Sequence, residues 1–193
     1  MSLVPHDKKT IKAVNQEAET KGLQIRALNM PYTCTSVETC NGDLSLLEKS
    51  METMNTRKRS RHVGKMLLSD GETLAAVAYV PIDDHIESED DKKNFVRISA
   101  REWLNTVLND VLASYGGGGA EGTVTVTEGS NEVLAFGTVT GPGQFAIKDR
   151  DIAQRASFTY LNANNVFPAR EGKDDDDSSS SEFILGDEEL GNL

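Results

Sequence analysis

The clearest pattern of apolar and polar positions in the chain lies between residues 99 and 115. Apolar side chains recur there every three or four residues, which is the spacing of one helix face. Ser99 and Glu102 stand at its start with the spacing of a capping box. The pattern predicts an amphipathic helix of about 16 residues that buries one face against a sheet and forms the main core element. Its apolar face would consist of Trp103, Leu104, Val107, Leu108, Val111, Leu112 and Tyr115.

A second apolar stripe predicts a helix from Leu44 to about Thr56. Asp43 is the expected N-cap, because a short acidic side chain can accept hydrogen bonds from the first free backbone N–H groups of a helix. The basic residues that follow Thr56 suit the negative end of the helix dipole. The apolar face would consist of Leu44, Leu47, Met51 and Met54.

Two strands are expected next, Met66–Leu68 and Thr73–Val80. The connection between them, Ser69–Glu72, contains Asp70 followed by Gly71, a pair that readily adopts the positive φ of a tight turn. This segment therefore predicts a β-hairpin.

Strict alternation of apolar and polar residues predicts a three-stranded meander later in the chain. Its strands would be Thr123–Thr127, Glu132–Thr140 and Gln144–Lys148, separated by Gly-rich turns. We expect antiparallel pairing, because these connections are too short for a parallel crossover.

The remaining segments have weaker patterns. Asp7–Lys21 is polar and compatible with a thin surface helix or arm, and Leu23–Leu28 alternates like a strand. Asn29–Gly42 is predicted to be a loop. Asp149–Arg155 is predicted to be a short helix and Ala156–Leu161 a last strand.

Together these elements predict an α+β fold in which an antiparallel sheet, a hairpin plus a three-stranded meander, packs on one main amphipathic helix. We expect residues 1–22 to form an N-terminal helical arm, residues 23–171 the α+β domain, and residues 172–193 a disordered acidic, Ser-rich tail. The tail holds eight acidic residues and one lysine. Such high charge and low hydrophobicity do not support a packed core.

Charge is segregated along the chain, and this limits what the total means. The net charge of the 193 residues is −11, but the tail contributes most of it, so the preceding part is only mildly acidic. The acidic total therefore does not exclude a nucleic-acid partner.

The sequence predicts a cytoplasmic protein, or part of a particle assembled inside a cell. Met1–Lys12 lacks the apolar core of a signal peptide, and no apolar run approaches the ~20 residues of a membrane span, so we expect no membrane contact. Cys34 and Cys40 match no common zinc spacing. We expect two free thiols in a reducing compartment, with a disulfide as the alternative.

No motif predicts catalysis, a metal site or a cofactor. The glycines at 116–119 follow a predicted helix and precede a strand, which is the reverse of a phosphate-binding loop. The acidic segment Asp83–Asp91 lacks the spacing of a calcium loop and is expected to be solvated. We expect no enzyme activity. A pocket with converging carboxylates of perturbed pKa would favour an enzyme instead.

Two segments predict binding. Five basic residues between positions 57 and 65 could neutralise phosphates, or could form a solvated helix end that pairs with the protein's own acids. In the tail, Ser178–Ser181 are candidate phosphorylation sites, and an apolar patch among acids resembles a docking peptide. The candidate nucleic-acid-binding residues are Arg57, Lys58, Arg59, Arg61 and Lys65, the phosphorylation sites are Ser178, Ser179, Ser180 and Ser181, and the partner-binding residues are Phe183, Ile184, Leu185 and Leu190.

These features favour a non-enzymatic assembly or adaptor protein, a subunit of a larger particle such as a virion or a multi-protein complex. It would use its terminal segments to contact a protein partner or further copies of itself. The alternative is a nucleic-acid-associated protein whose acidic tail regulates the basic patch.

Overall fold

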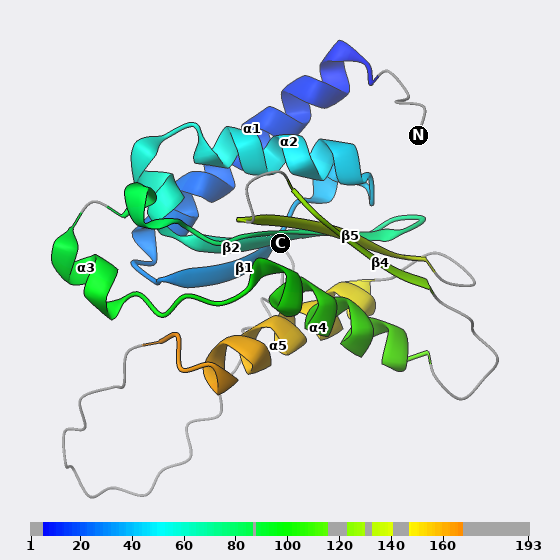
Figure 1. Cartoon of the computed structure of the whole chain (residues 1–193). Helices are drawn as coiled ribbons and strands as arrows, with labels where there is room; N and C mark the ends of the chain where they lie inside the picture. The colour runs from blue at the N-terminus through cyan, green and yellow to red at the C-terminus, as the bar shows by residue number, and fades with distance from the viewer. Residues whose placement is uncertain (1–5, 87, 116–122, 130–132, 141–146, 168–193) are drawn as a thin grey trace, which may run out of the picture.

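A mixed five-stranded sheet with the strand order β1-β2-β3-β5-β4 forms the centre of the structure, which is a computed structural model (Figure 1). Its strands are β1 (Tyr32–Ser36), β2 (Gly64–Ser69), β3 (Leu74–Tyr79), β4 (Thr123–Glu128) and β5 (Leu134–Thr140). The structure describes residues 6–86, 88–115, 123–129, 133–140 and 147–167. The expected tail, with its phosphorylation and docking residues, lies outside this range.

The sequence predicted a purely antiparallel sheet, and this prediction is wrong. β1 pairs with β2 in parallel, whereas the β2–β3, β3–β5 and β4–β5 pairs are antiparallel. The parallel pair is explained by helix α2 (Leu44–Asn55), which lies between β1 and β2 in the chain and provides the crossover connection that parallel strands require. The hairpin β2–β3 and the antiparallel pairing of β4 with β5 are confirmed.

Helices cover both faces of the sheet. Figure 1 shows α1 (Lys8–Ala27) and α2 on one face and α4 (Ala100–Ala113) and α5 (Ile147–Ala163) on the other. Each face has its own buried cluster of apolar side chains, so the sheet separates two cores. The short helices η1 (Glu38–Cys40), η2 (Lys58–His62), η3 (Asp83–His85) and α3 (Glu89–Asn94) lie in the connections.

The two helices with strong apolar stripes form as predicted. Ser99 caps α4 by accepting a hydrogen bond from the backbone N–H of Glu102 at 3.2 Å. Trp103 is completely buried, and its indole N–H donates to the Ser157 hydroxyl at 3.0 Å. Asp43 caps α2 through the backbone N–H of Leu46 at 3.1 Å.

Four predicted segments differ from the structure. Leu23–Leu28 is not a strand, because α1 continues through Gly22 to Ala27 and buries Val14, Ala18, Gly22 and Ile25 at helical spacing. Ala156–Leu161 is not a strand either, since it lies within α5. The expected loop at 29–42 contains β1 and η1. The expected third meander strand is also absent at its end, because Ile147 and Lys148 begin α5, while residues 144–146 lie outside the described range.

Gly71 lies in the predicted hairpin turn, but for a different reason from the one predicted. The described residues with positive φ are Asn29, Asn41, Gly42 and Asn165, and Gly71 is not among them. A Cβ atom on Gly71 would lie 2.3 Å from the carbonyl oxygen of Asn41. The position therefore requires glycine because the β2–β3 turn packs directly against the backbone at residues 41–42.

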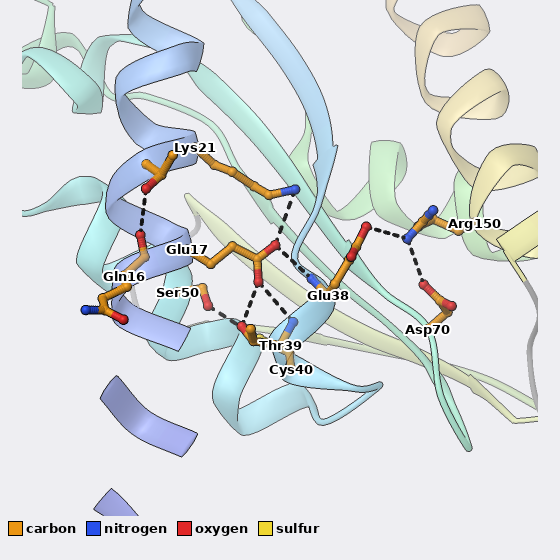
Figure 2. Close-up of polar contacts among 10 residues, drawn as sticks. Gln16, Glu17, Lys21, Glu38, Thr39, Cys40, Ser50, Asp70 and Arg150 are labelled. Carbon is orange, nitrogen blue, oxygen red and sulfur yellow. Dashed lines mark hydrogen bonds and ion pairs between the residues drawn. The ribbon is translucent and has the colours of Figure 1, made fainter. Parts of the chain in front are cut away.

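A polar network joins α1 and α5 to the connections at the end of the sheet (Figure 2). The Glu17 carboxylate accepts hydrogen bonds from the backbone N–H groups of Glu38, at 3.0 Å, and Thr39, at 2.9 Å. Arg150 of α5 lies between Glu38, at 3.6 Å, and Asp70 of the hairpin turn, at 3.3 Å. Partial burial acts to raise the pKa of Glu17, but the hydrogen bonds from Thr39 and Glu38 lower it overall. The network holds the end of β1 in place.

Candidate functional site

The sheet is covered unequally on its two faces, and this defines the candidate site. α4 packs on β3, β5 and β4, whereas α2, on the other face, packs on β2, β3 and β5. On that second face Thr123, Thr125 and Thr127 of β4 remain exposed, and Leu134, Phe136 and Thr138 of β5 are only half-buried. We call these six side chains the open face.

A pocket of about 390 Å³ lies between α2 and the open face. Its apolar lining comes from Met51 of α2 and from Val133, Leu134 and Phe136 on and beside β5. Its polar lining comes from Glu48, Glu52, Asn55, Thr56, Arg61, Tyr79 and His85. A volume of this size is within the range of sites that hold a ligand or a large side chain.

At one end of the pocket, Tyr79 joins two connections. Its hydroxyl donates to the carbonyl of Arg61 at 3.0 Å and lies 2.7 Å from Nδ1 of His85. Because a carbonyl can only accept, the Tyr79 proton is used there, and His85 must donate from Nδ1. Burial and the nearby charge of Arg61 lower the pKa of His85, so its ring is neutral at pH 7 with a lone pair on Nε2.

Lys65 lies beneath this end of the pocket and is completely buried. Its ammonium donates to Asn55 Oδ1 at 2.8 Å, to the carbonyl of Val63 at 2.9 Å and to the carbonyl of Ser60, and lies 4.7 Å from the centre of the Tyr79 ring. Burial lowers the pKa of Lys65 to about 7. Lys65 therefore closes the turn after α2. A phosphate contact would require an exposed side chain, and that of Lys65 is buried.

The other predicted basic residues are arranged around η2. Arg57 and Arg61 are exposed, and the Arg61 side chain donates from Nε to the carbonyl of Asn55 at 2.7 Å. Lys58 and Arg59 are the first two residues of η2. The structure thus keeps four of the five residues near one another and moves Lys65 inside. Phosphate binding by the four stays a prediction.

Two carboxylates stand on the α2 side of the pocket, one helical turn apart. Glu48 is half-buried and Glu52 is exposed, and no ion pair to either occurs among the described residues. Burial raises the pKa of Glu48, and the charges of Glu52 and Asp43 raise it further. Within the described part of the chain, the pocket therefore has an anionic wall without a paired cation beside its apolar floor.

The predicted cysteine chemistry agrees with the structure. Cys34 and Cys40 are buried free thiols, and burial raises their pKa values to about 12 and about 11. Neither is a thiolate at neutral pH, so neither is an activated nucleophile.

The acidic segment Asp83–Asp91 contains η3 and the start of α3. Asp83 pairs with Arg97 at 2.5 Å, and Ser88 caps α3. Within the described ranges, no three His, Cys, Asp or Glu side chains are grouped to hold a metal ion. None of the helices in those ranges has the length and apolar character needed to cross a bilayer.

Sequence reasoning did not find this pocket, because its walls come from α2, η2, η3 and the β5 region. Two local signals were present: Glu48 and Glu52 share a helix face at i and i+4, and Leu134 and Phe136 alternate with the buried Ala135 and Gly137. Comparison with known protein families and with curated proteins finds no match to this chain.

Proposed function

We propose that this chain is a non-enzymatic assembly or adaptor protein whose open face and adjoining pocket bind a protein partner. The observation that carries the proposal is the half-covered sheet, because apolar Leu134 and Phe136 stay partly exposed beside a pocket while the opposite face is packed under α4 and α5. Exposed apolar surface rimmed by polar residues is typical of interaction sites.

The chemistry of the pocket supports binding over catalysis. A catalytic acid or base is typically held in position by a neighbouring polar group. Glu48 and Glu52 stand a turn apart on the same helix, and no hydrogen bond or ion pair from the described residues holds either carboxylate. The Tyr79 proton is engaged by the Arg61 carbonyl, and burial raises the pKa of Tyr79 to about 12. Tyr79 thus supports the turn rather than a reaction.

Nucleic-acid association is the alternative, and it rests on Arg57, Lys58, Arg59 and Arg61 without Lys65. Four cations could still neutralise several phosphates, and such binding would weaken steeply with salt. Docking through Phe183, Ile184, Leu185 and Leu190 would also be binding to a protein partner, as in the main proposal. These residues lie outside the described range, so this docking stays a prediction.

The test is affinity purification from the native source with mass spectrometry, with and without nuclease. The bait is the full-length protein, as wild type, Thr125→Lys or Asn109→Lys. Thr125 lies in the open face, and Asn109 is an exposed control on α4. We expect a nuclease-resistant partner that wild type and Asn109→Lys retain and Thr125→Lys loses. Partners that disappear with nuclease, or that all three baits capture equally, would contradict the proposal.

A further inference from the structure

We propose that the partner segment that fills the open face is a basic amphipathic helix, with an apolar side chain in the pocket and a lysine or arginine beside Glu48 and Glu52. This inference rests on the proposed function and specifies its partner. It follows from the shape of the uncovered strip, from the charge of its α2 wall and from the composition of the chain itself.

The shape of the uncovered strip fits one helix. It spans β4 and the side of β5 that α2 leaves half-buried. Neighbouring strands are ~4.8 Å apart, so the strip with its flanks measures about 10 Å. An α-helix with side chains is about 10–12 Å across. A helix laid there would stand beside α2 and complete the second helical layer, opposite α4 and α5.

The surface of the strip changes from apolar to polar away from α2. Leu134 and Phe136 lie next to the pocket, and the β4 threonines lie farther out, with Thr127 opposite Phe136 and Thr125 opposite Thr138 in the strand register. A helix with one apolar stripe and a polar flank matches this arrangement, because its stripe faces the pocket and its flank faces the threonine hydroxyls.

The charge of the wall selects a basic helix. Glu48 and Glu52 have no cation partner among the described residues, and Glu52 and Asp43 both disfavour the charge on Glu48. Arg61, which donates to the carbonyl of Asn55, is the cation in the described lining, and because His85 is neutral the described lining carries a net negative charge. A lysine or arginine of the partner would pair with these carboxylates while its apolar neighbours enter the pocket.

The chain's own tail is a poor occupant for this site. Residues 172–193 do contain an apolar patch, but they carry eight acids and one lysine. Placing that segment beside Glu48 and Glu52 would bring like charges together, which opposes binding. The occupant is therefore a separate chain with the opposite charge.

The experiment selects peptides from a random 16-residue library displayed on phage, with the full-length protein as bait. The library is first exposed to the Thr125→Lys variant, and the peptides that bind this variant are discarded because they recognise surfaces other than the open face. We expect the enriched peptides to carry apolar residues at helical spacing flanked by lysine or arginine. Synthetic copies, measured by fluorescence anisotropy, should bind Glu48→Gln/Glu52→Gln about tenfold more weakly than wild type.

The control is Asp110→Asn/Asp151→Asn, which removes two exposed carboxylates from α4 and α5 and should leave affinity unchanged. The inference is overturned if no peptide survives depletion, if the enriched peptides are acidic, or if Glu48→Gln/Glu52→Gln binds them as wild type does. It is also overturned if deletion of residues 172–193 is needed before any peptide binds, since the tail would then be the occupant. A free protein that is dimeric by light scattering, and monomeric as Thr125→Lys, would assign the face to a second copy and overturn it too.

Failure here is distinguishable from failure of the proposed function. If the native partner is lost by Thr125→Lys but retained by Glu48→Gln/Glu52→Gln, then the open face binds a protein and only the basic helix is wrong. If Thr125→Lys and Asn109→Lys retain every partner equally, the proposed function itself fails.

Discussion

Lys65 is the residue whose chemistry depends most on the fold. Its three N–H groups donate to three acceptors, which is an arrangement suited to an ammonium, since a neutral amine has only two hydrogens to donate. Complete burial acts in the opposite direction and disfavours the charge. The result is a lysine that titrates near neutral pH while it holds η2 to the end of α2.

This titration predicts a pH dependence of stability. The pKa of Lys65 is about 7 in the folded chain, against an ordinary value of 10.5, so between these values the unfolded chain binds more protons. The free energy of unfolding should therefore rise from pH 7 upward, by at most about 1.4 kcal/mol per pH unit. Urea denaturation at pH 7.0 and at about 8.0, below the ordinary pKa of ~8.5 for a cysteine thiol, measures the rise.

Lys65→Met should lack this rise, and Lys93→Met, at an exposed position on α3, should keep it. If wild type and Lys65→Met change in parallel with pH, Lys65 does not titrate in this range and the assignment is incorrect.

Gly71 gives a second prediction at the residue scale. Gly71→Ala places a methyl group 2.3 Å from a backbone oxygen that cannot move independently of the 41–42 turn. We expect a loss of about 1–3 kcal/mol in stability, as for other overpacked sites. Thermal unfolding of Gly71→Ala and of Glu72→Ala, its exposed neighbour, measures this. Equal melting temperatures would mean that the two turns do not pack closely.

Both residues show where sequence reasoning ends. The sequence shows that Lys65 is charged but not that it is buried, so the prediction groups it with its basic neighbours. Lys65 is buried because β2 pairs with a strand on each side. The Asp70–Gly71 pair located the turn correctly through local propensity. The close approach of Asn41, 30 positions earlier in the chain, has no local signal.

At the scale of elements, caps and apolar stripes predicted α2 and α4, because these features report directly on one buried helix face. The α5 segment misled prediction, since Phe158, Thr159 and Tyr160 favour strands while its buried side chains are mostly small: Ala153, Ala156, Ser157 and Leu161. β1 was missed because Thr33, Thr35 and Ser36 resemble a loop, although Tyr32, Thr33 and Cys34 are buried.

The contact between α1 and η1 predicts a pH-dependent stabilisation by Glu17. The carboxylate accepts two backbone N–H bonds and one from the Thr39 hydroxyl at 2.7 Å. Glu17→Ala should lose about 1–3 kcal/mol at pH 7, since these donors lose a charged acceptor. Because the pKa of Glu17 is lowered from 4.5, the stabilisation is complete above that value and is lost as the pH falls through the folded-state pKa.

Chemical denaturation at pH 7 and near pH 3 measures this difference. Glu19→Ala, an exposed carboxylate on the same helix, is the matched control and should differ little from wild type at either pH. A Glu17→Ala deficit that is as large near pH 3 as at pH 7 would show that the carboxylate charge is not responsible.

At the scale of the whole molecule, the strand order decides what is covered. β3 pairs with β5 rather than β4, so β4 becomes the edge and lies farthest from α2. The sequence predicted the hairpin and the antiparallel β4–β5 pair, but the placement of one beside the other depends on contacts between residues far apart in the chain. The open face and its pocket follow from that placement, so they could not be predicted from local pattern.

The most direct test of the central claim is site-specific photo-crosslinking. The photoreactive amino acid p-benzoylphenylalanine replaces Thr125 on the open face or Asn109 on α4 in the full-length protein, which is then irradiated in lysate of its native source. We predict a discrete protein crosslink from position 125 and none from position 109, with the crosslinked partner identified by mass spectrometry. Position 125 giving no crosslink, or the same products as position 109, would contradict a docking site on the open face.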